Sequence, residues 1–182
     1  MRELVAAICA VLIFSVSGYG QKYFSKTGYV HFLSEAPIET IEATNNNSYV
    51  VFDATSGQME WSVLIKGFKF EKALMQDHFN ENYMESHKYP KAVFKGKADC
   101  GQINFSKDGQ YSMDVSGNMT IHGVTKPLNS PAKLIIKDGL LSVSGTFDIA
   151  IADYGIEVPK VVRENIAKNV KVTVKAGLQP LK

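Results

Sequence analysis

The sequence has few cysteines and almost no excess of charge of one sign. Cys9 and Cys100 are the two cysteines, and Cys9 lies in an N-terminal segment that we expect to be removed, so an internal disulfide is excluded in the mature chain. The formal net charge is +2, with 20 basic and 18 acidic residues spread along the sequence. Without a basic cluster the chain lacks the footprint of a nucleic-acid-binding protein. We therefore expect no nucleic-acid partner, and a Cys100 thiol that packs in the protein interior.

The sequence also lacks the residue spacings of common catalytic and metal sites. His31, His78, His87 and His122 form no H-x-H, H-E-x-x-H or Cys-His pattern. There is no G-x-S-x-G motif and no glycine-rich phosphate loop after a strand. We therefore expect no catalytic residue, no bound metal and no cofactor. His122, on the polar phase of its strand, is expected to hydrogen-bond at a barrel rim, and His78 to contact Tyr89 or a backbone carbonyl.

No apolar run is long enough for a membrane-spanning helix. The longest, residues 4–16 after Arg2, is shorter than the roughly 20 residues that cross a bilayer. Gly18 and Gly20 follow it, as small residues do before a signal-peptidase cleavage site. We expect residues 1–20 to be a signal peptide and residues 21–182 to form one domain, periplasmic or secreted, without a stable transmembrane anchor.

A two-residue alternation of apolar and polar side chains dominates the rest of the chain, as is typical of strands with one wet face. It is clearest between Tyr111 and His122 and between Leu141 and Ile151. Strands are expected near residues 28–34, 38–44, 48–54, 58–66, 91–99, 110–122, 131–137, 140–152 and 168–176. Ser56-Gly57, Asp108-Gly109 and Asp138-Gly139 are expected to form hairpin turns. The pattern predicts an all-β fold, a closed antiparallel lipocalin-like barrel of about eight strands.

One segment departs from this alternation. Between Glu71 and Tyr83, the residues Met75, Phe79 and Tyr83 recur at four-residue intervals, which predicts one short amphipathic helix that ends before Tyr89-Pro90. We expect it to cover a barrel mouth, as a lid over a cavity or as a cap that completes an ordinary core. A further helical turn is expected within residues 161–166.

A barrel of about eight strands is either filled by its own side chains or encloses one small ligand. Gly117 and Gly145 lie mid-strand on the apolar face, where each either leaves empty volume or lets the wall bend. The other inward residues are almost all apolar, which favours a long apolar guest. The expected lining and lid residues are Trp61, Met75, Phe79, Tyr83, Phe94, Met113, Val115, Gly117, Met119, Val143, Gly145, Phe147 and Ile149.

Three motifs resemble those of the YceI-like family. They are Asp77-His78-Phe79 with Tyr83-Met84 and the Lys-Tyr-Pro-Lys-Ala-Val-Phe run at 88–94; the Gly-Asn-Met-Thr-Ile-His-Gly-Val-Thr-Lys-Pro run at 117–127; and Asp153-Tyr154-Gly155-Ile156. The similarity covers nearly all of residues 25–176. It implies a lipocalin-like barrel, an extracytoplasmic location, and binding of a polyisoprenoid or another amphiphilic lipid. Met75-Gln76 stands where many members carry an arginine.

The expected partner is therefore an isoprenoid or fatty-acyl lipid, held for transport, storage or sensing. Two alternatives stay open at this point, a barrel enzyme and a module of the cell envelope that binds partners through the barrel exterior. The oligomeric state is also open, a homodimer included.

Overall fold

The computed structural model of the protein describes residues 22–181. The expected signal peptide, residues 1–20, lies outside the described residues. Within the described part of the chain, no helix is both long and apolar enough to span a membrane.

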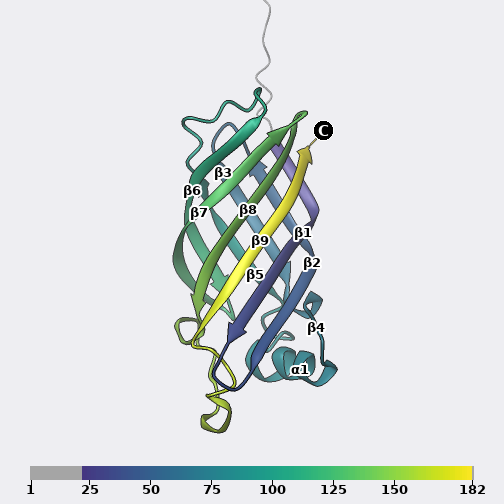
Figure 1. The fold of residues 1–182 in the computed structure, drawn as a ribbon, viewed down its shortest axis with the longest axis vertical. Coiled ribbons are helices and arrows are strands. Elements are labelled where there is room, and N and C mark those ends of the chain that lie inside the picture. Colours follow the sequence, from purple (N-terminus) through teal and green to yellow (C-terminus); the bar gives the residue numbers. More distant parts are fainter. Residues whose placement is uncertain (1–21, 182) are drawn as a thin grey trace, which may run out of the picture.

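Eight long strands form a tall, closed barrel (Figure 1). They are β1 (Lys22–Glu35), β2 (Thr40–Asp53), β3 (Gln58–Leu64), β5 (Lys91–Ala98), β6 (Gly109–Ile121), β7 (Val124–Lys137), β8 (Leu140–Ala150) and β9 (Asn169–Pro180). Each strand pairs antiparallel with its neighbours in the chain, and β1 pairs with both β2 and β9, which closes the sheet. The two-residue β4 (Lys69–Phe70) adds to β2. The predicted fold class is confirmed.

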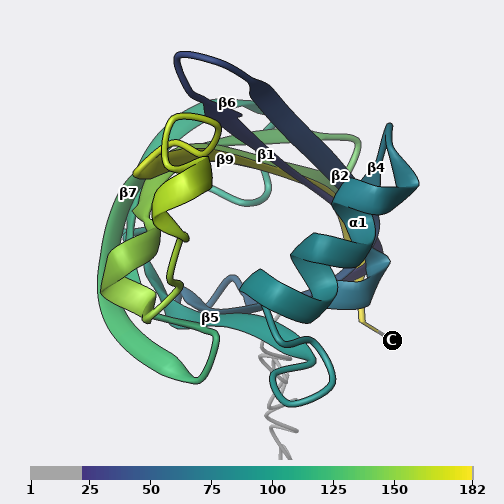
Figure 2. The ribbon, with the colours of Figure 1, turned by 90° about the horizontal axis from the view of Figure 1, so that it is seen from below.

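Helical segments gather at one end of the barrel, the lower end in Figure 1. The predicted helix is present as α1 (Ala73–His78), which continues into a π-helix, η2 (Phe79–Tyr83). The other helical segments are three 3-10 turns: η1 (Ile65–Gly67), η3 (Ile151–Tyr154) and η4 (Lys160–Val162). The last overlaps the turn expected within residues 161–166. Seen from below, α1, the β1–β2 connection and the chain between β8 and β9 surround this end (Figure 2).

Two of the three predicted hairpin turns are confirmed. Gly57 (φ 76°) precedes β3, and Asp138-Gly139 (φ 51° and 74°) joins β7 to β8. These positive φ values suit glycine, which has no Cβ to clash. The Asp108-Gly109 prediction is wrong, because Gly109 opens β6 after a long connection from β5.

A turn that alternation concealed lies at His122-Gly123, which joins β6 to β7 with φ values of 51° and 77°. The expectation that His122 continues its strand is therefore wrong. The sequence did not reveal the turn at His122-Gly123, because the apolar–polar alternation continues without a break up to Ile121. The structure also merges the expected strands 38–44 and 48–54 into β2, whose pairing with β1 is irregular between Ser48 and Asn45.

Strand β7 begins at Val124, well before the expected start at residue 131. Pro127 and Pro131 concealed its first half, because proline lacks the N–H that a central strand donates. Here the first half pairs only with β6, since the β7–β8 ladder begins at the Ala132–Gly145 pair. The prolines therefore lie in the part of the strand that has a paired neighbour on one side only.

Candidate functional site

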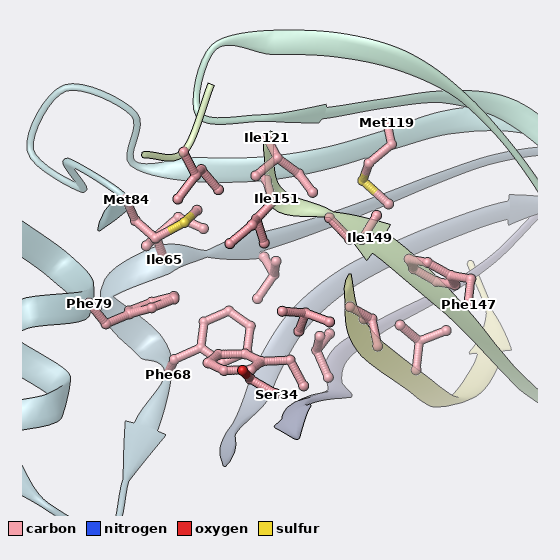
Figure 3. A pocket seen from close by; sticks show the side chains of 18 of the residues that line it. Ser34, Ile65, Phe68, Phe79, Met84, Met119, Ile121, Phe147, Ile149 and Ile151 are labelled. Atoms are coloured by element: carbon pink, nitrogen blue, oxygen red, sulfur yellow. The ribbon is translucent and has the colours of Figure 1, made fainter. Parts of the chain in front are cut away.

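An apolar cavity of about 520 Å³ runs inside the barrel. Side chains from all eight long strands reach it, with Ile41 as the contribution of β2, and so do side chains from α1, η2 and the β8–β9 connection. The close-up in Figure 3 shows aliphatic, aromatic and thioether groups converging on this space, with the Ser34 hydroxyl as the single oxygen among the labelled side chains. Such a lining binds through buried apolar area rather than through directed polar contacts.

The structure brings nearly all of the predicted lining residues together at this cavity. It is bordered by Trp61, Met75, Phe79, Tyr83, Phe94, Val115, Met119, Val143, Gly145, Phe147 and Ile149. These residues come from β3, the α1–η2 segment, β5, β6 and β8. That they contact a ligand stays a prediction.

Met113 and Gly117 are the predicted lining residues that the cavity does not reach. Met113 is buried in the main core cluster. Gly117 faces Gly96 across the β5–β6 ladder, and a Cβ at Gly117 would lie 2.5 Å from Gly96 Cα and 2.9 Å from Phe94 Cζ. This glycine permits a close approach of two strands beside a phenylalanine ring, so it leaves no empty volume.

Gly145 has the opposite environment. A Cβ at this position would meet nothing closer than Pro131 O at 3.5 Å, Val174 Cγ2 at 3.8 Å and Ala132 Cβ at 3.9 Å, which are ordinary van der Waals distances. The residue borders the cavity. The absence of a side chain at Gly145 therefore contributes to the open space, which is one of the two roles that its position in the sequence allowed.

Four phenylalanines form one wall near the lower end of the cavity. Phe79 of η2 packs on Phe32, Phe68 and Phe70 with ring centroids 5.4, 5.7 and 5.0 Å apart. Phe32 in turn contacts Phe68 and Phe70 at 5.5 and 5.7 Å. Such tilted and stacked pairs add about 0.5–1.5 kcal/mol each beyond their burial. The cluster therefore holds the helical segment against β1 and β4.

Several polar side chains meet at the lower mouth of the cavity. Glu39 accepts a hydrogen bond from Asn165 Nδ2 at 3.4 Å and pairs with Lys72 Nζ at 3.5 Å. Ser34, which is almost fully buried, accepts from the Ala167 amide at 2.9 Å through its hydroxyl. All of these side chains except that of Ala167 border the cavity. Because Lys72 and Glu39 neutralise each other, the mouth offers hydrogen-bonding groups with little excess charge.

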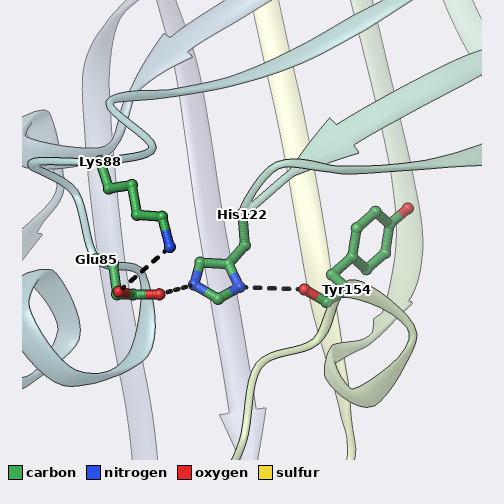
Figure 4. Close-up of polar contacts among 4 residues, drawn as sticks. All are labelled: Glu85, Lys88, His122 and Tyr154. Carbon is green, nitrogen blue, oxygen red and sulfur yellow. Dashed lines mark hydrogen bonds and ion pairs between the residues drawn. The ribbon is translucent and has the colours of Figure 1, made fainter.

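His122 joins three segments at the same end of the barrel (Figure 4). Its Nε2 lies 2.9 Å from Glu85 Oε2, and its Nδ1 lies 3.2 Å from the Tyr154 carbonyl oxygen. A carboxylate and a carbonyl only accept, so both hydrogen bonds form together only when both ring nitrogens carry protons. The Tyr89 ring packs edge-on against the imidazole at 4.6 Å. The expectation that His122 hydrogen-bonds at the rim is confirmed.

This contact fixes the helical segment to the barrel. Glu85 follows η2, His122 lies in the β6–β7 turn, and Tyr154 ends η3. Glu85 has a φ of 40°, in the left-handed region that costs a non-glycine residue about 1–2 kcal/mol. The hydrogen bond and the nearby Lys88 Nζ, 4.0 Å from the Glu85 carboxylate, help to offset that cost.

We predict that His122→Asn lowers the free energy of unfolding by about 1–3 kcal/mol, the usual cost of breaking a partly buried, charge-assisted hydrogen bond. Asparagine tolerates the φ of 51° at this turn, so the change tests the side-chain contacts. Urea unfolding near pH 6 measures the loss. The matched control is His31→Asn, which removes a 3.0 Å contact to the exposed Glu42 and should cost under about 1 kcal/mol. Equal losses in the two variants would contradict the role of His122.

Several cavity residues escaped the sequence analysis. Phe32 and Ser34 alternate with Val30 along β1, and this signal was available in the alternation of that strand. Ile151 ends the alternation that begins at Leu141, so its signal was also available, whereas Ile156 and Val162 come from a connection without regular periodicity. No sequence pattern could have placed that connection over the mouth.

Neither the free cysteine nor the possible metal-ligating residues form a reactive site in the described part of the chain. Cys100 is half-buried against the main core cluster, where burial, followed by the nearby Asp99, raises the pKa of its thiol. It therefore stays protonated near neutral pH. Among residues 22–181, no group of three or more His, Cys, Asp or Glu side chains is arranged to hold a metal ion.

A closed antiparallel barrel around one apolar cavity, with a helical segment at its mouth, defines the protein as a lipocalin-like barrel. A family model, the YceI-like domain, matches residues 25–178. The chain therefore belongs to the YceI-like family, as its motifs indicated. No curated protein matches it significantly.

Solved structures share the same fold at low sequence identity. A polyisoprenoid-binding domain from Saccharophagus degradans, implicated in plant cell wall breakdown, is 14% identical with a TM-score of 0.77, over 88% of this chain and 98% of that one. Burkholderia cenocepacia BcnA is 16% identical with a TM-score of 0.69, over 84% and 96%. A Campylobacter jejuni YceI protein is 17% identical with a TM-score of 0.57, over 75% and 81%.

Proposed function

We propose that this protein binds one long apolar lipid, a polyisoprenoid or a fatty-acyl chain, inside its barrel and does not act as an enzyme. The observation that carries this proposal is the cavity of about 520 Å³ with an almost wholly apolar lining. Glu39, Lys72 and Asn165 lie at the lower mouth, where a lipid's polar head would sit while the chain extends upward among the strands. The binding of polyisoprenoid by the fold relative from Saccharophagus degradans supports the same ligand class.

The cavity volume sets the length of chain that fits. A dry protein cavity of about 150 Å³ holds one benzene molecule, or about 25 Å³ per carbon. On that scale 520 Å³ holds on the order of 20 carbons. Burying 20 methylene-sized groups at about 0.8 kcal/mol each gives an upper bound of about 16 kcal/mol, from which the loss of ligand freedom is subtracted. Tight retention therefore needs no directed polar contact.

We also propose that the protein works outside the cytoplasm, after removal of residues 1–20, to carry, store or sense its lipid. The apolar segment at residues 4–16 and the small residues behind it support export. A direct test is native mass spectrometry of protein purified from its own cell envelope, followed by organic extraction. We expect an adduct in the mass range of a lipid. Recovery of the bare protein mass under gentle conditions, with no extractable lipid, would argue against the proposal.

The preference for chain length can be measured with Trp61, the single tryptophan of the chain. It borders the cavity and its Nε1–H donates to Ser48 Oγ at 2.9 Å, which fixes the indole in the wall. We predict that titration with isoprenoid alcohols of increasing length changes Trp61 fluorescence. The affinity should rise by about three powers of ten for each five-carbon unit. The rise should stop near 20 carbons, where the chain fills the cavity. Affinity that is independent of length would contradict a chain buried in the barrel.

A further inference from the structure

Three exposed aliphatic side chains stand around the lower mouth of the barrel. Ile38 lies in the β1–β2 connection, Leu74 in α1 and Val161 in η4, and they are 63%, 66% and 90% exposed. Their three segments surround the lower end in Figure 2. We call these residues the apolar rim. Large aliphatic side chains that are this exposed leave apolar surface in contact with water, which is unfavourable.

The segments that carry the apolar rim touch one another at the mouth. The Ile38 amide donates to the Glu164 carbonyl at 3.1 Å, which joins the β1–β2 connection to the chain after η4. The Lys72–Glu39 ion pair at 3.5 Å joins that same connection to the residue before α1. The rim is therefore one surface and not three unrelated positions.

The apolar rim is also continuous with the cavity. Leu74 itself borders the cavity, and so does Val162, the neighbour of Val161. Ile38 and Val161 do not border it, so they face away from the lipid and toward whatever lies outside the mouth. An apolar path thus runs from the outer surface of the protein into the barrel.

We propose that the apolar rim docks on a lipid bilayer, so that the guest passes between membrane and cavity without crossing water. This inference rests on the proposed function. A 20-carbon chain is disfavoured in water relative to a bilayer by roughly eleven powers of ten, so release into water before capture would be far too slow. Transfer at a docked mouth removes that barrier.

The charges beside the rim decide which membrane it fits. Glu39 pairs with Lys72 at 3.5 Å, and Glu164 follows Lys160 and Arg163 closely in the chain, so the two signs nearly balance and attraction to anionic lipid is weak. Docking is therefore hydrophobic and also transient, because even one 14-carbon acyl anchor gives only reversible binding with a constant of about 10⁴ M⁻¹. Vesicles of zwitterionic phosphatidylcholine are the appropriate partner.

The experiment loads phosphatidylcholine vesicles with a 20-carbon isoprenoid alcohol and follows its transfer to the full mature chain through Trp61 fluorescence. The rim variant carries Ile38→Asp and Val161→Asp, which leave the cavity lining intact. The matched control carries Leu140→Asp and Leu181→Asp, two exposed aliphatic residues near the opposite end of the barrel (Figure 1). Both variants change the charge equally. Circular dichroism checks that each remains folded.

We expect the rim variant to take up the alcohol from vesicles at least tenfold more slowly than the wild type, and the control at the wild-type rate. Binding of the same alcohol delivered from ethanol should agree within twofold in all three proteins. Equal vesicle rates in the rim variant and the wild type, or equal slowing in the control, would overturn the docking proposal alone. A wild type that fails to bind the ethanol-delivered alcohol would overturn the proposed function, and the docking proposal with it.

Discussion

Replacing Gly145 with leucine is expected to weaken lipid binding more than a hundredfold while the barrel stays folded. The nearest atoms to a Cβ at this position lie 3.5–3.9 Å away, and the residue borders the cavity. A leucine side chain adds four carbons and fills about 100 Å³ on the scale of 25 Å³ per carbon. The guest loses room for about four carbons, or about 3 kcal/mol. Its affinity should fall by more than a hundredfold.

Trp61 fluorescence titration with the 20-carbon alcohol measures this loss, and thermal unfolding checks the fold. The matched control is Gly177→Leu on the neighbouring strand β9, at an exposed position where a Cβ would meet nothing within 4 Å. It should bind lipid as the wild type does. If the Gly145 variant unfolds instead, or binds as well as the control, the open cavity is not where the lipid lies.

Replacing Gly117 with alanine is expected to destabilise the barrel by about 2–3 kcal/mol, a typical cost of overpacking. The added Cβ would overlap the Lys95 carbonyl oxygen and lie 2.5 Å from Gly96 Cα. Both are backbone atoms, so no change of rotamer relieves the clash. Strands β5 and β6 would have to move apart along a ladder that holds Val93–Ala98 to Val115–Thr120.

Gly145→Ala is the matched control for this second prediction, because it makes the same chemical change on a neighbouring wall of the barrel. Its Cβ fits at van der Waals distance, and we expect unfolding free energy within about 0.5 kcal/mol of the wild type. Urea unfolding compares the two variants. Comparable stability in both would show that β5 and β6 are not held at this close approach.

Much of the fold follows from local sequence patterns. The alternation along residues 110–122 and 140–152 predicted β6 and β8, because side chains on a strand point to opposite faces with a period of two. The four-residue spacing of Met75, Phe79 and Tyr83 predicted the helical segment, which the structure divides into α1 and a π-helix. Where prolines or turns interrupt a pattern, as in β7 and at His122, the local signal was misleading.

The cavity was only partly predictable. Alternation identifies which side chains point inward, and most of the predicted set does border the cavity. It does not determine how far apart facing strands lie, and so it could not show that Gly117 is covered by Phe94 while Gly145 faces open space. The mouth was less predictable still, because Glu39 meets Asn165 across 126 residues of sequence and Ser34 meets Ala167 across 133.

The sequence by itself determined an all-β chain with one wet and one apolar face on each long strand, a single helical segment, and family motifs between residues 77 and 156. Tertiary structure alone decided that the apolar faces enclose a space of about 520 Å³ instead of filling it. The physical reason is that period-two patterning acts along one strand, whereas empty volume depends on the distances between side chains that only barrel closure brings face to face.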